Sequence, residues 1–190
     1  MLDLIIKNGK CFIEGRLKEV DVAAKDGKIC KIGRISEEAK ETLNVEGQTV
    51  FPGCIDTQTH FREPGSTDTE DLHSGSRAAI AGGITSVFEM PNTNPPTSNI
   101  NEFQRKLDLA KDRMYCNYAF YFGATADNSN DLASLKNLEG CCGIKLFAGS
   151  STGNLLVAEE DDIDKVFQNA SKVVAVHSED EAILKVNKKL

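Results

Sequence analysis

The sequence predicts an α/β fold, namely an incomplete (β/α)8 barrel of about five β/α units preceded by a small N-terminal β-sheet. Two observations predict it. Up to about residue 48, short alternating strands are separated by turn residues, and from residue 49 onward the pattern changes to strand, loop and helix. Apolar strands that alternate with helices are typical of parallel sheets covered by helices. We therefore expect two domains, residues 1–48 and residues 49–190.

The N-terminal domain is predicted to form a small sheet. Its strands are expected at 4–6, 11–13, 19–23 and 28–32. Pairs of residues that favour hairpin turns lie between them: Asn8-Gly9, Glu14-Gly15 and Asp26-Gly27. A sheet of this size buries little apolar surface alone, so we expect it to pack against another part of the protein.

The second domain is predicted to contain five strands, each followed by a helix. The strands are expected at 49–55, 84–90, 116–122, 143–147 and 173–177. The helices are expected near 71–81, 99–112, 129–137 and 159–170, with a last helix that reaches the end of the chain. Five such units fit either an open doubly wound sheet or part of a barrel. No Gly-rich phosphate loop follows the first strand, which favours the barrel.

Polar residues at the ends of the predicted strands indicate where chemistry takes place. Four different strands end in or near such a residue: His60, Asn92, Lys145 and His177. Barrel enzymes carry their active sites at the carboxyl ends of the strands. On the first strand, alternation would place Asp56, Gln58, His60 and Arg62 on one face. Because each of these groups would need a partner inside a core, we expect them to form an active-site floor.

Composition and charge exclude several classes of partner. The formal net charge of -7 argues against a nucleic acid or an anionic membrane. No apolar run approaches the roughly 20 residues that cross a bilayer, and the N-terminus lacks the pattern of a signal peptide. The 6 cysteines lie mostly in apolar segments and form no Cys-x-x-Cys pair. Free thiols of this kind are typical of a reducing compartment, so we expect a cytoplasmic protein.

The segment from Asp56 to Arg62 resembles the Asp-x-His-x-His-x-Arg signature of the class I dihydroorotases of the amidohydrolase superfamily, with Gln58 in place of the first histidine. The resemblance continues over the chain in further segments: Ala78–Thr85, Glu89–Pro95, Gly143–Phe147 and Gly149–Asn154. It implies that the N-terminal sheet is half of a β-sandwich. It also implies the reversible hydrolysis of dihydroorotate to N-carbamoyl-L-aspartate, in de novo pyrimidine biosynthesis.

The resemblance implies zinc as the cofactor, with one or two ions in the family. His60, Lys145 and His177 match metal ligands, and Gln58 is a further candidate ligand. A neutral amide is a much weaker zinc ligand than an imidazole, so we expect at most one strongly held ion. In the superfamily the lysine is carbamylated and bridges two metals. The alternative for Lys145 is that its ammonium reaches the rim or pairs with an acidic neighbour.

Arg62 and Asn92 are the expected substrate-binding residues. Arginine presents a planar fork of donors to a carboxylate, and asparagine offers both a donor and an acceptor. The general-base aspartate of the family is expected beyond Leu190, so no catalytic residue is assigned within the chain. His73 is expected to be a solvated helix residue, and the acidic residues at 179–181 are expected to cap a helix.

We therefore expect a truncated cyclic amidohydrolase of the dihydroorotase type that has little or no activity alone. One alternative is a non-catalytic homologue that acts as a binding or scaffold module, which Gln58 favours. The other is an amidohydrolase of the hydantoinase or allantoinase type. The expected ligand is a small molecule, dihydroorotate or N-carbamoyl-aspartate. A homodimer is a further expected assembly, and the missing strands would come from a complementing C-terminal chain.

Overall fold

The computed structural model describes residues 1–151 and 154–188. The chain divides into two compact units, Met1–Pro52 and Gly53–Leu190. The boundary between the units therefore follows Pro52, four residues after the boundary predicted at residue 48. Strand β7 (Thr49–Val50) accounts for the offset, because it pairs with β2 (Lys10–Ile13) of the first unit.

The first unit contains two small sheets. One has the order β5-β4-β1-β6 and the other the order β3-β2-β7. The remaining strands of this unit are β1 (Leu2–Lys7), β3 (Arg16–Glu19), β4 (Asp21–Lys25), β5 (Lys28–Gly33) and β6 (Ala39–Asn44). The four predicted strands correspond to β1, β2, β4 and β5. Strands β3 and β6 were missed because they are largely exposed and polar, so no apolar alternation marks them.

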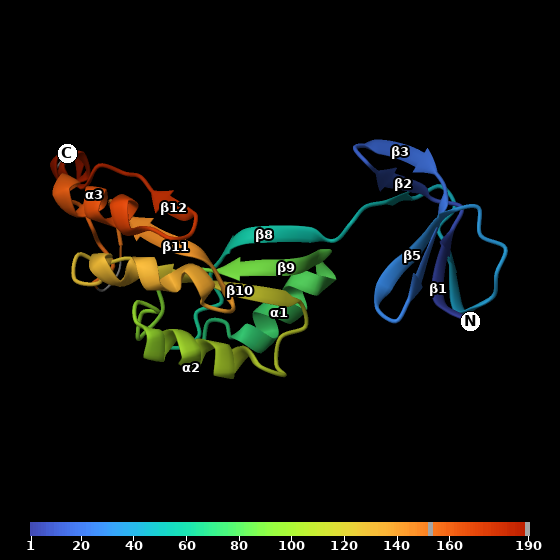
Figure 1. Cartoon of the computed structure of the whole chain (residues 1–190), viewed down its shortest axis with the longest axis horizontal. Coiled ribbons are helices and arrows are strands. Elements are labelled where there is room, and N and C mark those ends of the chain that lie inside the picture. The colour runs from blue at the N-terminus through green and yellow to red at the C-terminus, as the bar shows by residue number, and fades with distance from the viewer. Residues whose placement is uncertain (152–153, 189–190) are drawn as a thin grey trace. The chain divides into compact units, whose positions relative to one another are not determined.

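The second unit is built on a five-stranded sheet with the order β12-β11-β10-β9-β8, and every neighbouring pair is parallel (Figure 1). Its strands are β8 (Cys54–Thr59), β9 (Ile84–Glu89), β10 (Asn117–Gly123), β11 (Cys141–Phe147) and β12 (Val174–His177). Its helices are α1 (Leu72–Ala81), α2 (Ile100–Ala110), the 3-10 helix η1 (Ser129–Asn137), α3 (Glu160–Asn169) and α4 (Glu181–Asn187). The five predicted β/α units are therefore confirmed.

The predicted start of the first strand of this sheet is wrong. Residues 49–55 were expected to form it, but β8 begins at Cys54. Thr49 and Val50 pair with β2 instead, and Pro52-Gly53 separates them from the sheet. The two halves of the run 49–55 thus belong to different units.

The hydrophobic core of the second unit lies between one face of the sheet and the helices. Alternate strand residues point into it, including Phe120 and Phe122 of β10 and Ile144 and Leu146 of β11. Helical and 3-10 residues pack against them: Leu72, Phe103, Leu132, Leu135 and Val166. Because strand side chains alternate, Tyr121 and Lys145 point to the opposite face.

Helix α2 shows how the helices attach to the sheet. Its N-terminus is capped by Asn99, whose side chain accepts a hydrogen bond of 2.9 Å from the N–H of Glu102. Its buried residues Phe103, Lys106 and Ala110 are spaced as one helical stripe. A lysine therefore occupies a core-facing position. Among the helices of the described chain, none is long and apolar enough to cross a membrane.

Candidate active site

The structure brings the four polar strand-end residues to one side of the sheet. His60 directly follows β8, Asn92 lies three residues beyond β9, Lys145 lies near the end of β11, and His177 ends β12. All strands of the sheet run parallel, so their carboxyl ends form a common rim. This rim is where barrel enzymes assemble their active sites.

Strand β8 is irregular where Gln58 lies. Its register with β9 shifts between Asp56 and Thr59, and the Asp56 carboxylate accepts a hydrogen bond of 2.9 Å from the Gln58 N–H. Arg62 has a left-handed φ of 61°, so it lies beyond the extended strand. The alternation predicted from Asp56 therefore does not extend to Arg62, which lies outside the strand. Gln58 is exposed.

The loop after β8 is anchored by Phe61. This side chain is 6% exposed and belongs to the core of the second unit. It lies flat against α1 at Gly75, where an added Cβ would come within 2.4 Å of the Phe61 ring. Only glycine permits this approach, so Gly75 fixes how closely the loop sits on the helix. The polar neighbours His60 and Arg62 are held on either side of this anchor.

A buried carboxylate fixes the next turn of the same loop. Glu63 is 7% exposed and accepts a hydrogen bond of 2.9 Å from the Leu72 N–H at the start of α1. Arg113, beyond α2, donates to both of its oxygens at 2.8 and 3.1 Å. Pro64 accepts a hydrogen bond of 2.9 Å from the Asn94 N–H. The loops after β8 and β9 are thus tied together.

His60 lies in a cationic and partly desolvated environment. Burial lowers its pKa below the usual value, and the neighbouring charge of Arg62 lowers it further. Lys145 acts in the same direction from a greater distance, whereas the Asn92 side chain favours the protonated ring and opposes the shift. The imidazole is therefore neutral near pH 7. A neutral imidazole is the form that binds metal ions.

Lys145 is a buried amine. It is 3% exposed, and burial lowers its pKa. No ion pair of Lys145 occurs among the described residues, so the predicted alternative of an acidic partner finds no support there. Its ammonium lies 4.9 Å from the centroid of the Phe147 ring, within the range of a cation–π interaction. Burial thus favours the neutral amine, whereas the aromatic contact favours the charged form.

His177 ends the strand next to that of Lys145, where it lies opposite Phe147. Phe147 pairs with His177 across β11 and β12, and the two rings stack with centroids 6.1 Å apart. The Nε2 atom of His177 contacts the Glu179 carboxylate, and Nδ1 is the ring nitrogen outside this contact. Of the acidic residues expected to cap a helix, Asp180 does so by accepting from the Ile183 N–H at 2.9 Å. Glu179 instead contacts the histidine.

A cavity of about 360 Å³ opens between the loops that follow β8 and β9. It is lined by Arg62, Pro64, Ser66, Asn92, Thr93, Asn94 and Pro96. The Oδ1 atom of Asn92 is buried and makes no hydrogen bond of ordinary geometry within the described part of the chain, although the side chain lies near enough to His60 to favour its protonated ring. Buried polar atoms are normally paired, so this oxygen marks a place where a ligand would complete the contact. Both residues predicted to bind substrate, Arg62 and Asn92, thus border one cavity.

The residues predicted to bind metal fall into two neighbouring groups. His60 interacts with Asn92, Arg62 and Lys145, and Lys145 is linked through Phe147 to His177. Within residues 1–151 and 154–188, no group of three or more His, Cys, Asp or Glu side chains could hold a metal. The three predicted metal ligands include a lysine, Lys145, which is not one of these residue types. Imidazole nitrogen is a common ligand of divalent metals, and a lysine can act as one only after its ammonium is neutralised or modified.

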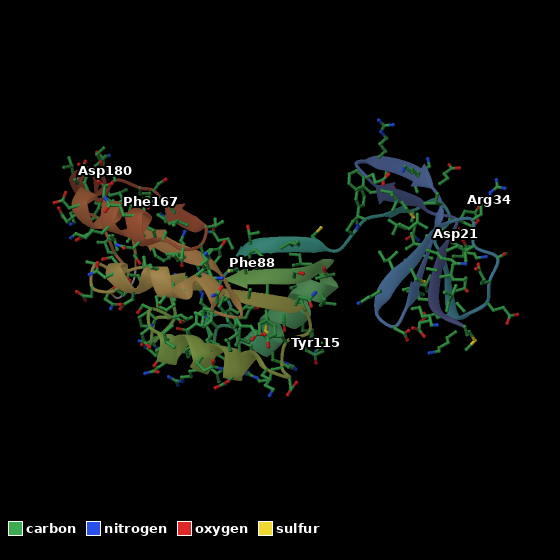
Figure 2. The ribbon with its side chains drawn as sticks, viewed as in Figure 1. Asp21, Arg34, Phe88, Tyr115, Phe167 and Asp180 are labelled. Atoms are coloured by element: carbon green, nitrogen blue, oxygen red, sulfur yellow. The ribbon has the colours of Figure 1, made fainter. Side chains whose placement is uncertain are left out.

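Several residues that shape the site were not singled out from the sequence. Glu63 and Glu89 are buried carboxylates, each paired with a cation on or just after α2. One signal for the Glu89 pair was a charged residue at the end of an apolar strand, because Glu89 directly follows Val87-Phe88. Phe88 is labelled in Figure 2. The other signal was the position of Lys106 on the apolar stripe of its helix. Glu179 gave no such signal.

The electrostatic environment of His60 predicts that two substitutions change its pKa in opposite directions. The Arg62→Gln substitution removes a positive charge, so we expect the pKa of His60 to rise. The Asn92→Ala substitution removes a group that favours the protonated ring, so we expect the pKa to fall further. The test is an NMR titration of the ring protons in the chelator-treated chain. The chemical shifts of His73 should be unaltered in both variants, and shifts of equal sign at His60 would contradict this account.

Comparison with known proteins places this site in a family. Residues 49–184 match the Amidohydrolase family. The chain is 34% identical over 186 residues to a dihydroorotase of Methanosarcina mazei, covering 95% of this chain and 40% of that protein. It is 35% identical over 190 residues to an allantoinase of Escherichia coli, covering 95% of this chain and 42% of that protein. The chain thus spans about two fifths of the length of these curated relatives.

Solved structures show the same fold. An L-hydantoinase (dihydropyrimidinase) from Arthrobacter aurescens matches with a TM-score of 0.90 and 28% identity, covering 100% of this chain and 43% of that chain. A D-hydantoinase matches with a TM-score of 0.80 and 26% identity, covering 100% of this chain and 42% of that chain. Together with the five parallel strands, this confirms the predicted incomplete barrel. The chain belongs to the amidohydrolase family.

Proposed function

We propose that this chain forms the N-terminal part of a metal-dependent cyclic amidohydrolase of the dihydroorotase type. The observation that carries the proposal is the convergence of His60, Asn92, Lys145 and His177 at the carboxyl ends of four parallel strands. Dihydroorotases, allantoinases and hydantoinases among the relatives support the hydrolysis of a cyclic amide. The domain division proposed from the sequence, 1–48 and 49–190, follows the same family pattern.

His60, Lys145 and His177 are the residues that would hold the metal, which we propose is zinc. When bound, the ion would polarise the amide carbonyl and lower the pKa of a water molecule. The low pKa of the buried Lys145 amine supports its conversion to a carbamate, since only the neutral amine reacts with carbon dioxide. Gln58 is exposed and would add at most a weak contact, so we propose one strongly held ion.

Arg62 and Asn92 favour dihydroorotate over neutral cyclic amides. Both residues line the 360 Å³ cavity, and the guanidinium of Arg62 is exposed where a ligand can reach it. Dihydroorotate carries a carboxylate, which an arginine fork binds through charge-assisted hydrogen bonds. The unpaired Asn92 Oδ1 would accept a hydrogen bond from a ring N–H. The cavity therefore orients an anionic cyclic amide beside His60.

Two other functions have support of their own. The likeness to allantoinases and hydantoinases favours a neutral cyclic substrate. The exposed Gln58, which replaces a histidine of the family signature, favours a non-catalytic binding or scaffold module. We also propose that the chain forms a homodimer or pairs with a complementing C-terminal chain. All six cysteines are free, which is in keeping with a reducing compartment such as the cytoplasm.

Ligand binding to the 190-residue chain separates these functions. We expect dihydroorotate and N-carbamoyl-aspartate to bind, and the Arg62→Gln variant to bind them about 10-fold to 100-fold more weakly, because a hydrogen bond to a charged group contributes about 1.5–3 kcal/mol. Calorimetry or ligand-observed NMR measures both. Hydantoin and allantoin serve as uncharged controls whose affinity should not depend on Arg62. Equal weakening of charged and uncharged ligands would contradict the assignment of Arg62.

Turnover in the same preparation tests catalysis. None of the residues that line the cavity is a carboxylate or an imidazole that could act as the general base. We therefore expect little or no dihydroorotate hydrolysis by the chain alone, with zinc added. A turnover number in the ordinary enzymatic range, about 1–10³ per second, would show that the chain is catalytically sufficient.

A further inference from the structure

A buried ion pair lies at the end of β9, outside the residues assigned to metal or substrate. Glu89 ends the strand and Lys106 lies on the core-facing stripe of α2, and their side chains are 1% and 0% exposed. The Lys106 ammonium contacts the Glu89 carboxylate. It also lies 5.3 Å from the centroid of the Phe120 ring. The pair is therefore enclosed between the sheet and α2.

Glu89 reaches the first of the two loops that carry the site. The backbone N–H of Phe61 faces its carboxylate closely enough to favour the charged form and lower its pKa. Phe61 is the residue between His60 and Arg62, and its side chain is already fixed in the core. With its N–H directed at this carboxylate, the peptide group between His60 and Phe61 has a preferred orientation. The direction of both flanking side chains follows from that orientation.

Lys106 reaches the second loop. Its ammonium donates a hydrogen bond of 3.0 Å to the carbonyl oxygen of Met90, two residues before Asn92. The N–H of Met90 in turn donates a hydrogen bond of 3.0 Å to the carbonyl oxygen of Thr59, directly before His60. One buried pair thus touches the backbone of both loops. Each contact lies within two residues of a proposed ligand-binding side chain.

The pair is not explained by stability alone. Burial raises the pKa of Glu89 to about 7 and lowers the pKa of Lys106, so keeping both charges inside the protein is unfavourable. Buried ion pairs can often be replaced by apolar side chains of similar volume without loss of stability. Apolar replacements, however, would offer no partner to the Phe61 N–H or the Met90 carbonyl. The polar contacts with the two loops are what only a polar pair provides.

We propose that Glu89 and Lys106 are positioning residues that hold the His60–Arg62 and Met90–Asn92 segments in the arrangement that binds metal and substrate. The metal part of this inference rests on the function proposed above. The backbone part does not, because it concerns the order of the two loops in the chain itself.

The test compares an apolar pair with an amide pair. In the E89L/K106M chain we expect an unchanged or higher unfolding midpoint, selective acceleration of amide exchange at Phe61 by at least about 10-fold, and zinc binding weakened by about 10-fold to 100-fold, as for lost outer-shell contacts. In the E89Q/K106Q chain the amides keep both polar contacts, so amide protection and zinc affinity should be largely restored. Unchanged Phe61 exchange and unchanged zinc affinity in E89L/K106M would overturn the proposal.

Leu135→Ala serves as the control for stability. Leu135 is buried on η1, away from both loops, so its loss should accelerate exchange of all core amides together rather than at Phe61. If E89L/K106M does not fold, K106M is compared with K106Q, and equal exchange and zinc affinity in those two variants would refute the proposal. If the unmodified chain binds no zinc, the proposed function fails, while amide exchange still decides whether the pair positions the loops.

Discussion

Replacing His60 with alanine is expected to weaken zinc binding by the chain by more than about 100-fold. The loss of a partner behind a metal ligand already weakens binding by about 10-fold to 100-fold, and removing a ligand has a larger effect. His60 is partly desolvated and neutral, so it contributes a donor without first releasing a proton. Competition with a chromophoric chelator measures the affinity directly.

His73 provides the matched control for this substitution. It is the same residue type, but it lies on α1, where its Nε2 atom is 3.2 Å from the hydroxyl of Tyr115 (labelled in Figure 2). We expect His73→Ala to leave zinc affinity within about 2-fold of the unmodified chain, because removing an exposed side chain away from the site disturbs no ligand. A similar loss in both variants would mean that zinc binds elsewhere.

Replacing Phe103 with alanine is expected to destabilise the second unit by about 3–5 kcal/mol, as for other buried aromatic side chains. Phe103 is 1% exposed, and its ring contacts Phe120 and Phe122 with centroids 6.4 and 6.2 Å away. Its loss leaves a cavity between α2 and the sheet that this rigid environment cannot close. The chain has no tryptophan, so urea unfolding followed by circular dichroism is the suitable measurement.

Phe167 is the control for the loss of an aromatic ring. It lies on α3 and is 51% exposed, and Figure 2 shows its position. The Phe167→Ala substitution should change the free energy of unfolding by no more than about 0.5 kcal/mol. If both variants lost similar stability, the core would not lie where the structure places it.

The sequence predicted the order of the β/α units well, because apolar strands alternating with helices leave few other folds. It failed at the first strand, where a continuous apolar run from Thr49 to Ile55 hid a change of unit at Pro52-Gly53. It also missed strands β3 and β6 in the first unit. Both are largely exposed and polar, so no apolar alternation marks them, and the partner of β6 lies far away in the chain at β1.

The candidate site was predictable in part for the same reason. His60, Lys145 and His177 could be picked out because each polar residue ends or interrupts an apolar strand. The contacts that hold them were not predictable, because they join residues far apart in the sequence. Glu63 pairs with Arg113, 50 residues away, and Lys106 bonds to Met90, 16 residues away. Only the fold brings these groups together.

The strand order has a mechanical consequence for metal binding. His60 belongs to β8 and His177 to β12, and these are the two outermost strands of the sheet. An ion shared by both imidazoles would cross-link the opposite margins of the sheet, so part of its binding free energy would act against flattening. Metal loading would then stiffen the curvature of the entire layer, and a layer forced flat would release its ion.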